Sequence, residues 1–243
     1  MVKKYELTDE VFEKKLPFCK PEKLYRIRAL QDIHFCGVKA GDLGGFVYSE
    51  EALSHSGWCW VHDNAKVLGN SKVLGDAQVK GSAIVSVSMI RDQAVIADQA
   101  RVYGSTIYGE AMVLDRAHVS GSWVYEQAKI YDEAFVNNCS GNDGIHGHAK
   151  IFGNAHVSHS EVYDYAQIYD DAETGIVACF PQGIKIYGRC HIHDKARIDG
   201  HARIYGMAEI FGNAEINGHA TACGTAFIGK YCVIGGQTVV SRS

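Results

Sequence analysis

The fold of this chain is decided by a six-residue motif, seen in Asn64-Ala-Lys-Val-Leu-Gly69, in Asp76-Ala-Gln-Val-Lys-Gly81 and again in Asn213-Ala-Glu-Ile-Asn-Gly218. A period of six matches neither the 3.6 residues of an amphipathic helix nor the two residues of a long strand. Three such units per coil would explain it, each with a short strand whose central Val or Ile points inward and a corner of two residues. The motif therefore predicts an all-β fold, a triangular parallel β-helix whose coils stack about 4.8 Å apart.

Two departures from the period of six interrupt the predicted coils. The step between inward residues widens to nine from Val136 to Ile145 and to twelve from Thr174 to Ile186. Both fall on the edge where shorter steps of five recur, so we expect two inserted loops, 137–144 and 175–185, to leave the same corner two coils apart. Loops on a rigid scaffold are where function concentrates, and these two mark the best place for a site.

Residues 1–46 do not repeat, and we expect them to form a small cap on one end of a β-helix that occupies residues 47–243. An open end of stacked strands invites edge pairing, so a non-repeating cap is physically expected. Within this cap, Thr8 is a plausible N-cap for a short helix over residues 11–16. Residues 24–30 alternate in polarity as a strand does.

Composition constrains the function loosely. The chain has 243 residues, with 24 Lys and Arg against 28 Asp and Glu, which gives a net charge of −4. Because there is no basic excess, we do not expect binding to a nucleic-acid polymer. No apolar run reaches the roughly 18 residues of a membrane-spanning helix, and the first residues lack a signal peptide, so no membrane partner is expected. We therefore expect a cytoplasmic protein whose eight cysteines are reduced thiols.

The repeats carry a resemblance to a known superfamily. From Ala65 onward, through Ala226-Phe-Ile-Gly-Lys-Tyr-Cys-Val-Ile-Gly-Gly236, the chain resembles the hexapeptide repeats of left-handed β-helix proteins. More narrowly, Val38-Lys-Ala-Gly-Asp-Leu-Gly-Gly-Phe-Val47 and Gly57-Trp-Cys-Trp-Val-His-Asp-Asn-Ala65 resemble YdcK-like proteins of bacteria and their phages. The superfamily includes trimeric acyl- and sugar-modifying transferases, so the resemblance implies left-handed winding and a homotrimer. A shared fold does not by itself supply a reaction.

Stacked coils turn outward-facing positions into columns of aromatic side chains. The first column follows the inward residues on the face just after the irregular corner and comprises Tyr108, Tyr125, His146, Tyr163, Tyr187 and Tyr205. The second column lies on the next face and comprises Tyr131, Phe152, Tyr169, His193 and Phe211. Such columns either support the sheet and a trimer contact or offer a stacking platform for a planar ligand. Both roles hold at once if ligand sites lie between protomers.

A ligand site is therefore expected along the first column and under the two loops, with Asn142, Asp143 and Phe180 as loop contacts. The preferred hypothesis is a non-catalytic trimer that captures a small planar or nucleotide-like ligand in grooves between protomers. Sequestering a host signalling nucleotide would be a natural use for a phage-type protein. No cofactor is expected.

Histidines support a second hypothesis, an acyltransferase of the hexapeptide type. The run Gly144-Ile-His146-Gly-His148 closes the first loop. A neutral imidazole of His146 or His148 could act as the general base toward an acceptor hydroxyl or amine. A third hypothesis is a purely structural protein, in which the aromatic columns only hold the trimer together.

Cysteines do not favour a metal site. A Cys2His2 shell would need Cys139 and Cys179, one from each loop, beside the two loop histidines. No C-x2-C spacing supports such a shell, so no metal is expected. Cys190 and Cys232 occupy the small inner-corner position that Ala usually takes, and we expect both to be packing residues.

Overall fold

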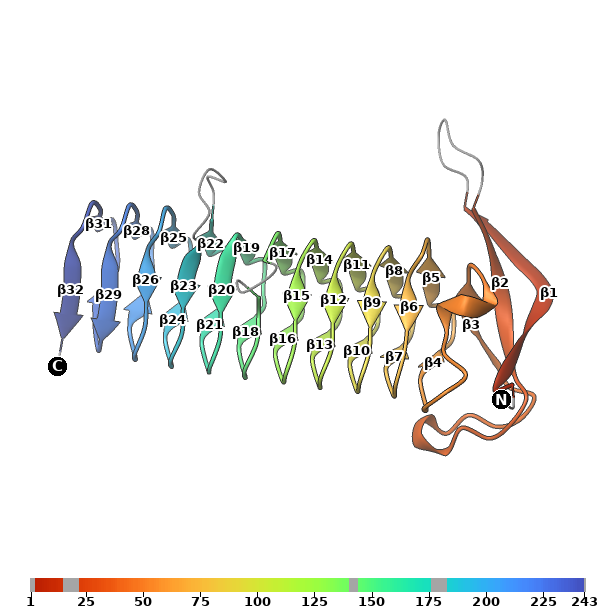
Figure 1. Cartoon of the computed structure of the whole chain (residues 1–243). Helices are drawn as coiled ribbons and strands as arrows, with labels where there is room; N and C mark the ends of the chain where they lie inside the picture. Colours follow the sequence, from red (N-terminus) through yellow and green to blue (C-terminus); the bar gives the residue numbers. More distant parts are fainter. Residues whose placement is uncertain (1–2, 15–21, 140–143, 176–182, 243) are drawn as a thin grey trace. The chain divides into compact units, whose positions relative to one another are not determined.

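The computed structural model describes residues 3–14, 22–139, 144–175 and 183–242, which are built almost entirely of β-strands (Figure 1). The chain forms two compact units, Met1–Asp115 and Arg116–Ser243. In both units the short strands of successive coils pair in parallel. The predicted all-β parallel β-helix is therefore confirmed as a parallel β-solenoid. The handedness of the winding and the triangular section stay predictions.

Unit 1 begins with an antiparallel meander and continues as parallel coils. β1 (Tyr5–Lys14) pairs with β2 (Glu22–Ala29), and β2 pairs with β3 (Leu43–Val47), both antiparallel. Two 3-10 helices, η1 (His34–Cys36) and η2 (Glu50–Ala52), lie on either side of β3 in the chain. The coils then add strands to three sheets, which comprise β5 (Lys66–Leu68), β8 (Ile84–Ser86) and β11 (Arg101–Tyr103); β4 (Trp60–Val61), β7 (Gln78–Val79), β10 (Val95–Ile96) and β13 (Met112–Val113); and β6 (Lys72–Val73), β9 (Met89–Ile90) and β12 (Thr106–Ile107).

The short helix expected over residues 11–16 is contradicted over residues 11–14, which belong to β1, while residues 15–16 lie outside the described part of the chain. Phe12 is the Cα partner of Leu24 in β2, and its ring centroid lies 5.9 Å from that of Phe46. Pairing and aromatic contact with distant residues override a weak local helix signal. β3 pairs with β2 on one side and, in parallel, with β5 on the other, so the predicted cap boundary at residue 46 stays a prediction.

One charged side chain of unit 1 lies in its interior. Lys4 is 1% exposed. Its Nζ donates hydrogen bonds to the carbonyl oxygens of Cys59 at 2.9 Å and Gly57 at 3.3 Å, and to the Cys59 Sγ at 3.3 Å. Three acceptors match the three N–H groups of the ammonium, which is the condition for burying a charged side chain.

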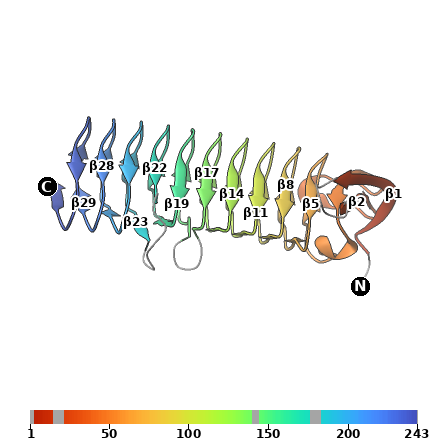
Figure 2. The ribbon, with the colours of Figure 1, turned by 90° about the horizontal axis from the view of Figure 1, so that it is seen from above.

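Unit 2 consists of three parallel sheets, to which successive coils add strands in turn (Figures 1 and 2). Sheet I comprises β14 (His118–Ser120), β17 (Phe135–Asn137), β19 (His156–Ser158), β22 (Glu173–Thr174), β25 (Arg197–Ile198), β28 (Glu215–Ile216) and β31 (Val233–Ile234). Sheet II comprises β16 (Lys129–Ile130), β18 (Lys150–Ile151), β21 (Gln167–Ile168), β24 (His191–Ile192), β27 (Glu209–Ile210) and β30 (Phe227–Ile228). Sheet III comprises β15 (Trp123–Val124), β20 (Ser160–Val162), β23 (Ile184–Ile186), β26 (Arg203–Ile204), β29 (Thr221–Gly224) and β32 (Val239–Arg242), with Ile145 bridging β15 and β20.

The core of unit 2 follows the sequence repeat. Ile151 and Ile168 are Cα partners in successive coils and both are fully buried, as is Ala149 at the inner corner. Cys190 takes the same inner-corner position and is fully buried, which confirms its packing role. Cys232 is exposed, so that prediction is wrong. Among the described strands β31 pairs only with β28, which leaves the outer side of its coil uncovered.

The corners show how Asp can replace Gly where the backbone needs a positive φ. Asp132 and Asp194 have φ values of 59° and 58°. Each carboxylate accepts a hydrogen bond from a backbone N–H at the same corner one coil later, that of Gly153 at 3.0 Å and that of Gly212 at 2.9 Å. The bond pairs an amide that lies outside the strands, and it offsets the strain of left-handed backbone in a residue with a Cβ.

The two insertions fall in the chain between β17 and Ile145 and between β22 and β23, and β19 lies between β17 and β22 in sheet I (Figure 2). Ile184 and Lys185, predicted within the second loop, belong to β23. Cys139 does not leave the solenoid with the first segment either. It is fully buried, and its N–H donates to the Ser122 Oγ at 3.1 Å, so the chain completes its corner before the segment begins.

Candidate functional site

The first aromatic column forms a continuous stack in unit 2. Neighbouring ring centroids lie 4.6–5.1 Å apart and the ring planes are within 8° of parallel. The stack contains five of the predicted site residues, all partly exposed: Tyr125, His146, Tyr163, Tyr187 and Tyr205. The sixth, Tyr108, belongs to unit 1, where the Arg91 guanidinium lies 4.3 Å from its ring centroid.

The spacing of this stack limits what it can bind. The ring faces already contact one another at close to the roughly 4.8 Å spacing of the coils, so a planar ligand cannot enter between them without separating paired strands. The column therefore offers a ligand its ring edges and tyrosine hydroxyls. Burial, and next the charge of Glu161, raise the pKa of Tyr163 to about 12. At neutral pH that hydroxyl is protonated, as an ordinary tyrosine hydroxyl also is, and it can donate a hydrogen bond.

The second column stacks in the same way. Its centroids lie 4.8–5.8 Å apart and its ring planes are within 15° of parallel, through Tyr131, Phe152, Tyr169, His193 and Phe211. Two columns with nearly one geometry show that stacking along the coils is a general feature of unit 2. Aromatic stacking alone therefore does not distinguish a ligand site from a structural ladder.

Charged side chains gather beside the first column in three successive coils of sheet III. Glu161 of β20 is the Cα partner of Lys185 in β23, and the Lys185 Nζ lies 2.6 Å from the Glu161 Oε2. The other carboxylate oxygen, Oε1, lies 3.7 Å from the His146 Nε2. The side chains of Glu161 and His146 are 14% and 19% exposed, against 41% for Lys185. We call these three residues the Glu161 cluster.

The Glu161 cluster lies between the points where the two inserted segments rejoin sheet III. Gly144 directly precedes Ile145, which bridges to Val162 of β20. Gly183 directly precedes β23, which pairs with β20. Glu161, in the strand between the two rejoining points, therefore links them through its contacts with His146 and Lys185.

The two candidate general bases have different surroundings. The His146 Nε2 is buried and has no hydrogen-bond partner among the described residues, and its Nδ1 lies 3.7 Å from the Glu126 Oε2. A general base must lie within hydrogen-bond reach of the proton that it abstracts. A substrate on the surface cannot reach the buried Nε2, and Glu126 lies beside Nδ1, so this arrangement does not favour His146 as the base. His148 is exposed, and its ring stacks on that of Tyr165 at 4.7 Å.

Several predicted loop residues lie outside the described part of the chain: Asn142, Asp143, Phe180 and Cys179. Cys139, the other cysteine considered as a metal ligand, points into the corner, where its Sγ lies 3.5 Å from the Asn137 carbonyl oxygen. Buried in this way, it faces the solenoid interior and not a loop site.

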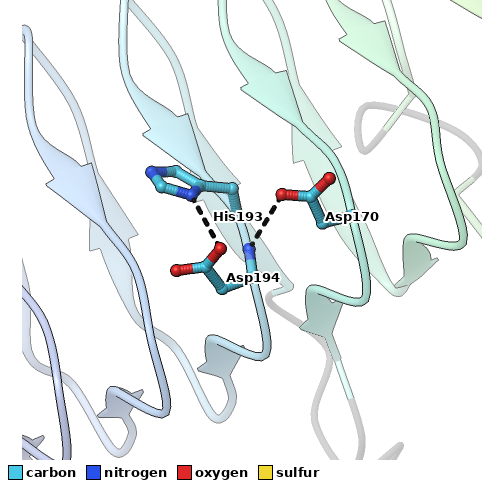
Figure 3. A group of neighbouring side chains, drawn as sticks. All are labelled: Asp170, His193 and Asp194. Atoms are coloured by element: carbon cyan, nitrogen blue, oxygen red, sulfur yellow. Dashed lines mark hydrogen bonds and ion pairs between the residues drawn. The ribbon is translucent and has the colours of Figure 1, made fainter.

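A different group of potential metal ligands lies at the end of sheet II: Asp170, His193 and Asp194 (Figure 3). One donor atom from each lies within 4.8 Å of the others. The Asp194 Oδ1 lies 3.4 Å from the His193 Nδ1, and the Asp194 N–H donates to the Asp170 Oδ2 at 3.4 Å. The Gly212 N–H, as the largest cause, lowers the pKa of the Asp194 carboxyl. These contacts make the group a corner hydrogen-bond network, and we assign no metal to it.

In comparisons with known proteins, no family model matches this sequence and no curated protein matches it. The likeness to hexapeptide-repeat and YdcK-like proteins therefore rests on the motifs alone. The described residues include no helix with the length and apolar character needed to cross a membrane.

Proposed function

We propose that this protein captures a small nucleotide-like ligand, without transforming it, on the flank of unit 2 that carries the Glu161 cluster. The observation that supports this is the convergence of charge and tyrosine edges between the points where the two segments rejoin sheet III. A nucleotide offers hydroxyls, ring nitrogens and phosphates. These groups suit the hydroxyls of Tyr163 and Tyr187 and the ammonium of Lys185.

The proposal includes the architecture that the motifs imply. The coils would be hexapeptide repeats wound left-handed around a triangular section, and the protein would be a cytoplasmic homotrimer with its ligand in grooves between protomers. Partly exposed aromatic edges along one flank suit such a contact. Light scattering coupled to size-exclusion chromatography tests the trimer, and a monomer or dimer would contradict this part.

Calorimetric titration with a panel of mononucleotides and cyclic dinucleotides tests the binding function. We expect at least one to bind and to be recovered chemically intact. Tyr163→Phe preserves the ring stack but removes a hydroxyl, and one lost hydrogen bond should weaken binding about three- to tenfold. The matched control is Tyr169→Phe in the second column, which should bind as the unaltered protein does. Absence of any nucleotide binding, or equal weakening by both substitutions, would refute the proposal.

One observation favours a purely structural alternative. The second column stacks with nearly the same geometry as the first, although it follows sheet II and not the sheet where the segments rejoin. If the columns only stiffen the solenoid, substituting Tyr163 or Tyr169 should change stability and leave no binding to lose. Nucleotide titrations of Tyr163→Phe and Tyr169→Phe therefore distinguish a ligand-binding column from a purely structural one.

A further inference from the structure

A surface hollow of about 180 Å³ lies in sheet III, next to the Glu161 cluster. It is formed where β23, β26 and β29 lie side by side (Figure 1). Six residues line it: Gly183, Lys185, His201, Arg203, His219 and Thr221. Lys185 and Arg203 are Cα partners, as are Arg203 and Thr221, so their side chains leave the same face of the sheet in successive coils. We call this feature the basic hollow.

The basic hollow carries charge of a single sign. Among the described residues, no Asp or Glu lines it. Lys185 has Glu161 as its partner on one side. Arg203, however, lies between Lys185 and Thr221, and within the described ranges its guanidinium takes part in no hydrogen bond or ion pair. Residues 176–182, which precede Gly183, contain no Asp or Glu in their sequence. Like charges on neighbouring strands destabilise a sheet, and a bound anion would relieve that repulsion.

The outward faces of unit 2 do not all have this character. On sheet I, Arg197 lies 3.3 Å from Glu173, and the two are Cα partners in successive coils. The hollow beside them mixes both signs of charge, with Asp171, Glu173, Lys195, Arg197, Asn213 and Glu215 in its lining. Arg197 on sheet I, which is paired with Glu173, therefore serves as a comparison for Arg203 in the basic hollow.

The donors of the basic hollow suit a tetrahedral oxyanion. The rings of His201 and His219 stack at 4.7 Å, and Gly183 precedes them at the same corner without a side chain to fill the space. Each imidazole carries at least one N–H, the Lys185 ammonium carries three and the Arg203 guanidinium five. The volume is more than ten times the roughly 10–15 Å³ that one buried water requires. A group with several acceptor oxygens can therefore enter and meet donors from three coils.

We infer that the basic hollow binds a phosphate group, held by Lys185, Arg203 and the imidazoles of His201 and His219. A guanidinium binds two phosphate oxygens at once through parallel N–H groups, and an ammonium adds a point charge. The inference rests on the proposed function only where it identifies this group as the phosphate of a nucleotide-like ligand. Inorganic phosphate can bind the hollow whether or not a nucleotide does.

The test is titration of the full chain with inorganic phosphate and with pyrophosphate at low ionic strength, by calorimetry and by NMR of the histidine ring protons. We expect saturable binding that shifts the signals of His201 and His219. Arg203→Gln should weaken binding at least about tenfold, because it removes a charged donor pair. Arg203→Lys should retain part of the affinity. Arg197→Gln is the matched control and should leave phosphate binding unchanged.

Two results would overturn the inference. One is the absence of saturation up to about 10 mM phosphate in the unaltered protein. The dissociation constant would then be above about 10 mM, which is too weak for a specific phosphate site. The other is equal weakening by Arg203→Gln and Arg197→Gln, which would indicate attraction to net positive charge only. Nucleotide binding without phosphate binding refutes this inference and leaves the proposed function standing. Phosphate binding without nucleotide binding supports this inference and refutes the proposed function.

Discussion

The ion pair between Glu161 and Lys185 should stabilise unit 2 more than an ordinary surface pair does. Its atoms lie 2.6 Å apart, and the Glu161 side chain is only 14% exposed while that of Lys185 is 41% exposed. Fully exposed pairs contribute roughly 0.2–1 kcal/mol, whereas breaking a fully buried pair costs roughly 3–5 kcal/mol. With one partner 14% exposed and the other 41% exposed, the pair lies between these two cases, and we expect a coupling energy of about 1–2 kcal/mol.

A double-mutant cycle measures this coupling energy directly. Glu161→Gln, Lys185→Met and the double variant would be compared with the unaltered protein by urea denaturation. The matched cycle uses Glu173→Gln and Arg197→Met, because that pair is 3.3 Å apart and 42% and 50% exposed. We expect its coupling energy to be below about 0.5 kcal/mol. In thermal unfolding, a loss of about 1–2 kcal/mol lowers Tm by about 2–8 °C at this chain length.

Equal coupling energies in the two cycles would show that Glu161 is as well solvated as Glu173, which contradicts the expected gain from its burial. A second readout comes from the pKa of Tyr163, followed by NMR of labelled tyrosine rings. In Glu161→Gln that pKa should fall, because a nearby negative charge no longer opposes the tyrosinate. It should remain above its ordinary value, because burial is the larger cause of the rise.

Three further predictions concern other parts of the chain. Lys4→Met should destabilise unit 1 by about 2 kcal/mol in urea denaturation, because the buried carbonyl oxygen of Cys59 loses its charged donor; an unchanged midpoint would contradict this. The hydrogen bond from the Gly212 N–H is the main cause that lowers the pKa of the Asp194 carboxyl in the folded protein. The ionised carboxylate therefore stabilises the fold at pH values above the ordinary carboxyl pKa of about 3.9. This contribution to the free energy of unfolding is lost as the pH falls through the lower folded-state pKa. Thermal melts should therefore show that Asp194→Asn loses less stability than the unaltered protein on acidification below about pH 4; identical acid profiles would count against the bond. Burial raises the pKa of Cys190 to about 12, so iodoacetamide at about pH 8 should modify Cys232 and spare Cys190 until unfolding, as mass spectrometry would show.

The coils could be predicted because local sequence and fold agree in every repeat. Ile151 is inward and β-branched, Ala149 is small enough for the corner, and the same pair of residue types recurs in coil after coil. The N-terminal meander offers no such repetition. Phe12 lies in a strand because of Leu24 and Phe46, which are distant in sequence. The pattern of neighbouring residues contains no information on those distant partners and therefore predicts a helix there.

The aromatic column could be predicted from the sequence, whereas the charged cluster beside it could not. The spacing of inward residues predicts that Tyr125 through Tyr205 form one column, but only the ring distances in the structure show that the ring faces contact one another. The Glu161 cluster was missed because Glu161 and Lys185 are 24 residues apart, across an inserted segment. Aligning the position just before each inward residue would have revealed that column as Glu161, Lys185 and Arg203. The predicted first loop begins too early in the sequence, because Cys139 still belongs to the corner, as Ser122 does one coil before.

Amide hydrogen exchange can show whether a nucleotide-like ligand binds beside the Glu161 cluster, as we propose. The full chain would be compared with and without the tightest-binding nucleotide of the panel, with exchange read along the whole sequence by mass spectrometry. Binding at this cluster should slow exchange in β20 and at the two points where the segments rejoin sheet III, before Ile145 and before β23. Unchanged exchange there, or slowing confined to β21 and β24 of sheet II, would contradict it.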